Sequence, residues 1–501
     1  MKKYIIIATL AVIALSGCSL EQKPFLTQSN DMALIDFNGI NKATAGAYAP
    51  LVDATWYGAD FVLHSELRAE NATRPVNTDF QSGRYVLPFN MSYAPEATSG
   101  LWAAGYYVIS AANNVIEAVE TAGVEAYLSK GVEEQDIYNV LAECYFLRAL
   151  SHFDLVRQYG YSIAKVKRDA SKAEYGVPVI LKTDKTGKLQ PKRDSVETVY
   201  RQIISDLLYA EEIIDPDYER GSVASKRAAA SIGAIQALLS RVYLYHQDYQ
   251  EAADYATKVI ENPMYEMWTE EEYPSVWAAD KGDGEVIFEV YGLQTNDYDA
   301  YWEGPSHMTN PKGYADCAAS PVLVAIYGEN DVRGTQGVRG EDDGKVMFCT
   351  DPEKKSNGEL WTMKYQGKGF GDAVQTPDQS NTIVIRLSEM YLNRAEAIAN
   401  GAVVSGVTAK DDINAIRNNR GVAPEVTEPS VATVLAERRK ELCFEGHYWY
   451  DVARTDGEIS YQDERRPSII LDKASMYWAL PIPKREFNVN ENLEQNPGYI
   501  K

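Results

Sequence analysis

The chain contains little of the chemistry that most metal centres and active sites need. Its 501 residues include only five cysteines and five histidines. No C-x-x-C pair and no H-E-x-x-H run occurs, which argues against a structural or catalytic zinc ion. A phosphate-binding G-x-x-x-x-G-K loop and a G-x-S-x-G nucleophile turn are missing as well. We therefore expect no catalytic residue, no bound metal and no cofactor.

Basic residues and long apolar runs are also scarce. Lys and Arg number 49 against 72 Asp and Glu, which gives a formal net charge of −23. This balance argues against nucleic acid and against an anionic membrane surface as partners. The apolar run at residues 4–15 follows Lys2 and Lys3 and is too short to span a bilayer permanently. We therefore expect residues 1–17 to be a signal peptide.

The end of this leader predicts a lipid anchor. Leu15-Ser16-Gly17-Cys18 resembles the bacterial lipobox, which implies cleavage before Cys18 and lipidation of its thiol. Several acyl chains on one terminus hold a protein stably at a membrane, whereas a single chain does not. Residues 18–30 would then form a lipidated tether. Ordinary secretion with cleavage at another position is the alternative.

The remaining cysteines and two acidic loops carry weaker signals. Cys144 and Cys443 lie in helical apolar patterns and are expected to be buried thiols. Cys317 and Cys349 lie in loop-rich sequence, where the spacing leaves a disulfide open. Residues 280–285 and 341–344 loosely resemble calcium loops, but they lack the full twelve-residue ligand pattern, and turn formation explains them as well.

An internal repeat predicts the fold. Residues 141–145, 239–243 and 387–391 all have the pattern Leu-small-x-x-Tyr. This pattern is typical of the first helix of a tetratricopeptide repeat, where the small residue lets the partner helix approach closely. The predicted partner helices follow at residues 195–214, from 248 and at 411–420. The sequence thus predicts an all-α repeat scaffold with long insertions, in which minor β structure includes a strand at 285–290.

The predicted organisation divides the chain into two large regions. They are an N-terminal helical region at 31–265 and a C-terminal region at 266–501, which contains a returning repeat unit at 382–421.

Two long stretches without helical periodicity, residues 56–95 and 264–381, concentrate aromatic residues among Gly, Asn and Asp. Insertions in a repeat scaffold commonly gather on one face, so we expect the two stretches to meet and form a ligand face. Stacking of aromatic rings on a sugar or a peptide side chain is one role for these residues, and anchoring of loops in the core is the other. The candidate ligand-binding residues are Tyr298, Tyr301, Trp302, Tyr291, Trp56, Tyr57, Phe80 and Tyr93.

A charged stretch near the C-terminus, residues 437–452, has two interpretations. It is predicted to be helical up to Phe444 and to stop at Gly446, with Arg438 close to Glu441 one turn away. Glu441, Glu445, His447 and Asp451 would form a metal or acid/base cluster in one interpretation. In the other they belong to an ion-pair network that joins two helices around Phe444 and Trp449. We favour the network because further metal ligands at suitable spacing are missing.

This stretch resembles the C-terminal signature of the SusD/RagB family, in the run Glu437-Arg438-Arg439-Lys440-Glu441-Leu442-Cys443-Phe444-Glu445-Gly446. The resemblance extends from the lipobox through residues 101–113 and 285–290 to 480–483 and 495–499. It implies a SusD-like tetratricopeptide-repeat scaffold with a loop-rich ligand face.

The resemblance also implies a function. Members of this family are non-enzymatic lipoproteins of the outer membrane that face the cell exterior. They pass captured nutrient, as a lid, to a TonB-dependent transporter of the SusC/RagA type. The RagB-like size of this chain implies oligopeptide ligands, and glycan binding is the alternative. A surface glycoside hydrolase or peptidase is disfavoured because the sequence shows no catalytic constellation.

Overall fold

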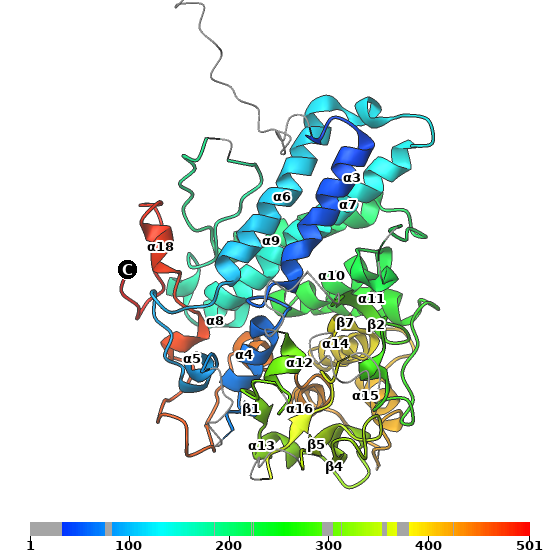
Figure 1. Ribbon diagram of the computed structural model, residues 1–501, viewed down its shortest axis with the longest axis vertical. Coiled ribbons are helices and arrows are strands. Elements are labelled where there is room, and N and C mark those ends of the chain that lie inside the picture. Colours follow the sequence, from blue (N-terminus) through cyan, green and yellow to red (C-terminus); the bar gives the residue numbers. More distant parts are fainter. Residues whose placement is uncertain are drawn as a thin grey trace, which may run out of the picture.

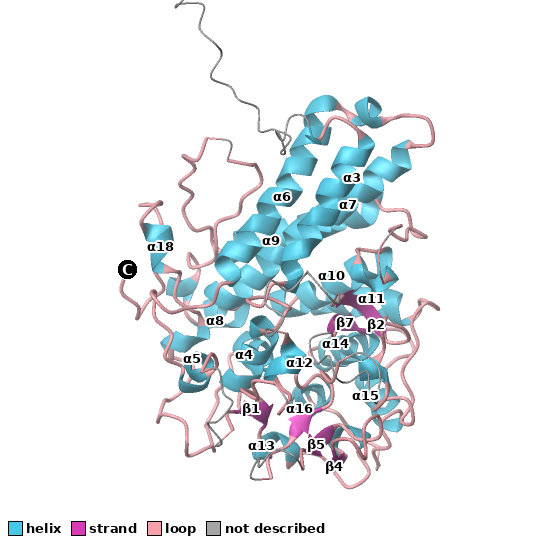
Figure 2. Ribbon diagram, viewed as in Figure 1, coloured by secondary structure: helices cyan, strands magenta, loops and turns pink. Residues whose placement is uncertain are grey.

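The computed structural model describes residues 33–501, except 76–82, 185, 222, 224, 293–303, 312, 353–357, 368–379 and 424. Most of this chain is helical, and the strands form three small sheets (Figure 2). Long helices lie side by side at one end of the molecule, and shorter helices and the sheets fill the other end (Figure 1). None of the helices among the residues described is long and apolar enough to cross a membrane.

The predicted repeat pairs are present. The three first helices are α7 (Glu134–Tyr159), α10 (Ile232–His246) and α14 (Leu387–Ala399), and their partners are α9 (Val196–Ile213), α11 (Tyr249–Ile260) and α15 (Ala409–Asn418). The small residues of the pattern, Ala142, Ser240 and Ser388, are completely buried. Ser240 Oγ donates a hydrogen bond to the carbonyl oxygen of Ala252, 2.9 Å away. A small side chain at this position is therefore what allows α10 and α11 to touch, as the sequence predicted.

Two of the pairs are also joined by a buried bidentate ion pair. Arg148 on α7 donates to both carboxylate oxygens of Asp206 on α9, at 2.8 and 2.7 Å. Arg394 on α14 binds Asp412 on α15 in the same way, at 2.9 and 2.6 Å. Each arginine follows the Tyr of its repeat pattern by three residues and so lies on the same helix face.

The other elements complete this frame. α3 (Phe37–Tyr48) and α6 (Leu101–Ala122) pack against α7 (Figure 1). The shorter helices are α4 (Asp60–Arg68), α5 (Val86–Asn90), α8 (Ile163–Arg168), α12 (Pro305–Met308), α13 (Pro321–Val324), α16 (Val431–Glu441), α17 (Tyr448–Arg454) and α18 (Lys484–Phe487). The strands are β1 (Ala72–Thr73), β2 (Val286–Val290), β3 (Ala318–Ala319), β4 (Gln336–Val338), β5 (Phe348–Thr350), β6 (Trp361–Thr362) and β7 (Thr382–Arg386).

The sheets bring distant segments together. β2, the strand predicted at 285–290, pairs antiparallel with β7, and Val286 lies opposite Arg386. β1 pairs antiparallel with β3, so that Ala72 lies opposite Ala319. β5 pairs with β4 in parallel and with β6 in antiparallel orientation. All of these are short strands between helical elements, as a scaffold with minor β structure requires.

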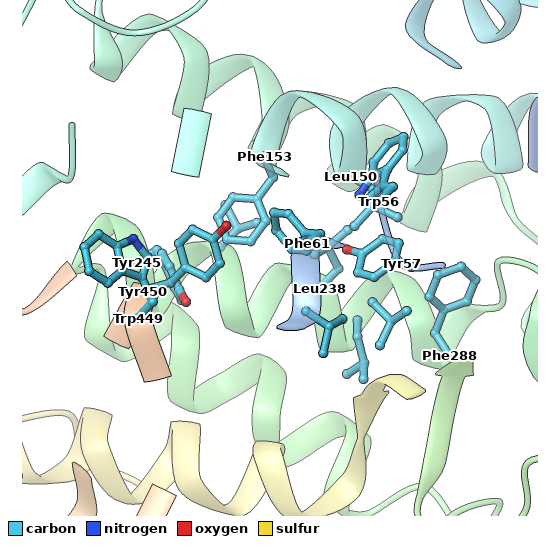
Figure 3. Packing of buried hydrophobic residues seen from close by; sticks show 14 of the residues in the cluster. Trp56, Tyr57, Phe61, Leu150, Phe153, Leu238, Tyr245, Phe288, Trp449 and Tyr450 are labelled. Carbon is cyan, nitrogen blue, oxygen red and sulfur yellow. The ribbon is translucent and has the colours of Figure 1, made fainter. Parts of the chain in front are cut away.

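Aromatic rings from several elements meet in one large core (Figure 3). They include Phe61 from α4, Phe153 from α7, Tyr245 from α10, Phe288 from β2 and Tyr450 from α17. The rings of Phe61 and Tyr450 are stacked with centroids 5.3 Å apart, and such pairs add stability beyond the area they bury. The core thus joins the repeat helices to the C-terminal region.

The prediction that residues 56–95 lack regular structure is wrong in part, because they contain the buried helix α4. Its polar residues are buried together with its apolar ones, so the sequence shows no apolar stripe. Glu66 accepts hydrogen bonds from Asn71 Nδ2 at 2.8 Å and from the backbone N–H of Gly446 at 3.1 Å. The guanidinium of Arg68 lies 3.8 Å from the ring centroid of Trp449. Polar partners elsewhere in the chain thus replace the missing hydrophobic pattern.

The predicted ion-pair network exists, and Glu441 is its centre. The Glu441 carboxylate is completely buried and contacts three arginines: Arg333 at 3.0 Å, Arg386 at 2.6 Å and Arg420 at 2.8 Å. Glu285 shares Arg386 and Arg420 with it. These arginines hold the pKa of Glu441 well below its usual value, even though burial opposes this shift.

A neighbouring set of ion pairs links α16 to α17 and to the repeats. Arg438 on α16 donates to both oxygens of Asp451 on α17 at 2.9 Å, and its Nη2 lies 3.3 Å from Glu389 on α14. Although Arg438 is within one helical turn of Glu441, its partners are Asp451 and Glu389. Arg438 Nη2 also lies 3.3 Å from His447 Nδ1, so this histidine belongs to the network. The structural interpretation of residues 437–452 is the correct one.

The end of α16 also differs from the prediction. The helix ends at Glu441, and Phe444 as well as Gly446 has a positive φ, of 61° and 80°. Side chains from other segments donate hydrogen bonds to the backbone carbonyls that the helix leaves without partners. Arg386 Nη2 donates to the backbone oxygen of Glu441 at 2.7 Å, and the Tyr365 hydroxyl donates to that of Phe444 at 2.6 Å. These tertiary hydrogen bonds satisfy the helix end earlier than its sequence indicates.

All four cysteines of the described chain are buried and unpaired. Cys144 and Cys443 are buried thiols, as predicted. Cys317 and Cys349 form no disulfide, which settles the alternative that the sequence left open.

We predict that replacing Glu441 with alanine lowers the free energy of unfolding by about 3–5 kcal/mol, because three buried arginines lose a shared partner. Chemical denaturation of the full chain measures this change. Glu428→Ala, an exposed glutamate just before α16, is the control and should change stability little. Unchanged melting with lost ligand binding would instead assign Glu441 to a functional site.

We also predict that the protein loses stability below pH 6.5 through its buried histidines. Burial, with Arg148 as a second cause, lowers the pKa of His152 to about 3, and its neutral ring accepts from the backbone N–H of Ile180 at 3.3 Å. His152 is therefore protonated below about pH 6.5 in the unfolded chain, but only below about pH 3 in the folded chain. Each such histidine costs about 1.4 kcal/mol per pH unit within this window.

His152→Phe tests this assignment. The variant should be less stable than the wild type at pH 7, but its free energy of unfolding should fall less steeply between pH 6.5 and 4. An equal slope would show that His152 is not neutral in the folded state. Glu66 has the opposite effect on the pH dependence of stability. Burial raises its pKa to about 6, so the folded chain binds this proton at a higher pH than the unfolded chain does.

Candidate functional site

A cavity opens beside the sheet of β2 and β7, within the second predicted ligand stretch. Its empty space, counted to the open mouth, is about 520 Å³. Trp268 and Trp277 form its wall, and Lys281, Asp283 and Asn381 lie at its exposed edge. We call it the tryptophan cavity.

The wall is rigid and aromatic. The rings of Trp268 and Trp277 lie 5.5 Å apart at an angle of 70°, and Tyr273 packs edge-on against Trp277 at 5.6 Å. Lys364 Nζ lies 4.6 Å from the centroid of the Trp277 ring and is held by Glu445. The Trp277 indole N–H is buried and has no hydrogen-bond acceptor among the residues described.

The edge of the cavity is polar and well ordered by hydrogen bonds. Asn381 Nδ2 donates to the Asp280 carbonyl at 3.1 Å and to Glu289 Oε2 at 3.0 Å, while its Oδ1 accepts from the N–H of Gly292 at 3.1 Å. The Tyr291 hydroxyl donates to Asp280 Oδ1 at 2.9 Å. Partial burial, together with this carboxylate, raises the pKa of Tyr291 to about 12. Tyr291 is therefore a neutral ring fixed by Asp280, whose carbonyl also accepts from Asn381 at the cavity edge.

This arrangement suits binding without catalysis. Amide, carboxylate and ammonium groups at the edge can bind hydroxyls, and the wall is apolar, with Trp268 and Trp277 only 6% and 8% exposed. No cluster of three or more metal-ligating side chains occurs in the part of the chain that the structure describes. In the acidic loops, backbone N–H groups donate hydrogen bonds to the carboxylates. The N–H of Gly284 donates to Asp283 Oδ1 at 2.9 Å, and that of Val338 donates to Asp342 Oδ2 at 3.0 Å. These contacts are those of turns.

Three of the candidate ligand residues lie in the core instead. Trp56 and Tyr57 are 0% and 3% exposed, and both donate to Asp154 Oδ2, at 2.7 and 2.6 Å. Tyr93 is 5% exposed, with its hydroxyl 3.5 Å from His64 Nδ1. These side chains lack the free surface that ligand stacking needs, so their role as ligand contacts is corrected to loop anchoring, the alternative given for these aromatics.

Of the remaining candidates, Tyr291 is half-buried and is linked to the edge of the tryptophan cavity through Asp280. Cys18, Phe80, Tyr298, Tyr301 and Trp302 lie outside the described residues.

The two predicted ligand stretches do meet in space. β1 belongs to the first and β3 to the second, and they pair. Close to this contact the guanidinium of Arg84 lies 5.7 Å from the ring centroid of Tyr314. The first stretch also reaches the end of the second across Thr382, whose Oγ1 donates to the Tyr57 carbonyl at 2.8 Å.

Sequence reasoning did not select Trp277, Lys281 or Asn381. The two tryptophans belong to the aromatic-rich region around the strand at 285–290, which was a usable signal. No pattern in the sequence identifies Asn381, because its position at the cavity edge depends on the pairing of β7 with β2.

Comparisons with known families cover both halves of the chain. A profile described as "SusD family" matches residues 339–499, and one described as "Starch-binding associating with outer membrane" matches residues 23–244.

Individual proteins agree with these matches. The chain is 26% identical to SusD-like protein P2 of Formosa agariphila over the full length of both. It superposes on a SusD superfamily protein from Bacteroides vulgatus with a TM-score of 0.80 and 25% identity, covering 93% of this chain and 100% of the other. A putative sugar binding protein from the same species gives a TM-score of 0.77 and 26% identity with the same coverage.

Proposed function

Because this chain belongs to the SusD/RagB family, we propose that it is a cell-surface lipoprotein that captures an extracellular glycan. Two comparisons support a sugar ligand, the starch-binding family profile and the putative sugar binding protein from Bacteroides vulgatus. The preference for oligopeptides rested on chain length and gains no such support. Glycan binding, the alternative from the sequence, is therefore the better-supported reading.

The tryptophan cavity is the observation that carries this proposal. It combines a wall of two largely buried indoles, 6% and 8% exposed, with a polar edge formed by Lys281, Asp283 and Asn381. A sugar presents an apolar ring face and a rim of hydroxyls, so its groups match both parts of the site. Tyr298, Tyr301 and Trp302 follow Tyr291 closely in sequence, and we propose that they extend the same stacking surface.

The protein acts by binding and not by catalysis in this proposal. Lipidation of Cys18 would anchor it to the outer membrane with its body facing the cell exterior, and residues 18–30 would form the tether. A TonB-dependent transporter of the SusC/RagA type would be the partner, with this chain as its lid. The ligand face would then be turned toward the transporter.

A binding experiment distinguishes the ligand classes. The full chain, purified in detergent, is incubated with a glycan panel and with a peptide mixture, and the retained molecules are identified and titrated by calorimetry. We expect oligosaccharides to be retained without conversion. Retention of peptides alone would overturn the glycan proposal, and cleavage products would show an enzyme.

Variants locate the site in the same experiment. The triple change of Tyr298, Tyr301 and Trp302 to alanine, and separately Tyr291→Ala, should weaken glycan affinity while leaving melting nearly unchanged. Stacked aromatics commonly contribute about 2 kcal/mol or more each, so calorimetry will resolve the loss. Tyr107→Ala on α6, 64% exposed and outside both ligand stretches, is the matched control. Unaltered affinity in both variants would place the site elsewhere.

A further inference from the structure

A groove open to solvent lies against α16 and α17, and none of its residues lines the tryptophan cavity. Its space, counted to the open mouth, is about 790 Å³, compared with about 520 Å³ for that cavity. Apolar side chains form much of the lining, namely Ile326, Leu435, Ala436, Tyr448 and Val452. We call it the α16 groove.

The lining follows from helix geometry. On α16 it consists of Leu435, Ala436, Arg439 and Lys440, and on α17 of Tyr448, Asp451, Val452 and Thr455. Steps of three and four residues place each set on one face of its helix. The buried face of α16 carries Glu437, Arg438 and Glu441, which belong to the ion-pair network. One face of α16 is thus fixed in the core, while the other borders the groove.

Arg439 is held in place without being neutralised. Its Nε donates to Asn71 Oδ1 at 2.8 Å, and its guanidinium lies 4.2 Å from the ring centroid of Tyr448. Asn71 is itself fixed, because its Nδ2 donates to Glu66. Both partners of Arg439 are uncharged, and its Nη1 and Nη2 groups have no partner within the described chain. Two such groups in one plane are the arrangement that binds a carboxylate bidentately.

Lys440 is a second cation of the groove without a carboxylate partner. Its backbone carbonyl accepts from the Tyr327 hydroxyl at 2.9 Å, but its ammonium makes no ion pair with a described residue. The carboxylates of the lining do not compensate the two cations. Asp451 is paired with Arg438 and Arg454, and Glu458 is exposed and contacts neither Arg439 nor Lys440. In a chain of net charge −23, this groove therefore favours an anion.

We propose that the α16 groove binds an organic carboxylate with a branched aliphatic body. The carboxylate accepts hydrogen bonds from Nη1 and Nη2 of Arg439 and pairs with the Lys440 ammonium. The aliphatic body packs against Leu435, Ala436 and Val452. An inorganic anion would leave this apolar lining in water, and a neutral sugar would leave both cations unpaired. This site is separate from the glycan site and does not depend on that proposal.

A ligand-observed NMR titration of the full chain with sodium 4-methylpentanoate tests the proposal, with 4-methylpentanamide as the uncharged analogue of the same shape. We expect a Kd on the order of 1 mM for so small a ligand. The carboxylate should bind at least about fivefold more tightly than the amide, because an ionised acceptor forms the stronger hydrogen bonds.

The same chemistry occurs in a free branched-chain acid and at the C-terminal residue of a peptide. N-acetyl-leucine distinguishes these two sources. Tighter binding of N-acetyl-leucine than of 4-methylpentanoate identifies a peptide end as the ligand, and weaker binding identifies a free acid.

Variants locate the site. Arg439→Gln should weaken 4-methylpentanoate binding by about fivefold or more, and Arg439→Lys by about threefold, because lysine keeps the charge but lacks the planar pair of donors. Lys440→Gln should weaken it by about threefold with unchanged melting, since its side chain has no partner to lose. Lys440→Gln therefore decides the matter if the Arg439 variants melt early.

The matched control is Lys410→Gln on α15, an exposed lysine outside the groove, which should leave binding unchanged. Melting curves accompany each titration. Absence of 4-methylpentanoate binding, equal binding of the amide, or full affinity in the folded Arg439→Gln and Lys440→Gln variants would overturn the proposal.

Discussion

The carboxylate of Glu441 holds the C-terminal half of this molecule together. Arg333, Arg386 and Arg420 converge on it from three different segments, and Glu285, just before β2, shares two of them. An unpaired buried charge strongly destabilises a fold. A set of buried charges that is fully paired is tolerated, but only in the one geometry that pairs all of them. The network therefore fixes where β2, β7, α14 and α16 lie relative to one another.

The tryptophan cavity depends on this geometry and shares Lys364 and Glu445 with the network. β2 and β7 carry its floor, Glu445 of the network holds Lys364 beneath Trp277, and Asn381 stands just before β7. The network thus supplies stability, whereas the exposed edge supplies the contacts that a ligand can reach. In the proposed function, the charged core residues are structural and the exposed edge makes the contacts with the ligand.

The sequence predicted the repeat helices well because their signal is local. A small residue, a Tyr and apolar spacing within one helix identify α7, α10 and α14. Helix α4 was not predicted, because its Glu66 and Arg68 are buried against partners far along the chain. The arginine partners of Glu441 could not be predicted for the same reason. Arg420, Arg386 and Arg333 are 21, 55 and 108 residues from it in sequence.

The candidate site was predicted only in outline. Aromatic composition pointed to stretches that meet in space, and Tyr291 is linked through Asp280 to Asn381 at the edge of the tryptophan cavity. Composition cannot tell a ring that stacks on ligand from one that anchors a loop, and burial places Trp56, Tyr57 and Tyr93 in the second class. The polar edge at Asn381 needs the β2–β7 pairing to be known first.

In the proposed function, ligand binding and stability depend on adjacent parts of one structure. Hydrogen exchange of the full chain with and without a bound oligosaccharide tests it most directly. The account predicts added protection at residues 268–292 and 380–383, with α16 and α17 unchanged. Protection confined to α16 and α17, or spread evenly over the repeat helices, would contradict it.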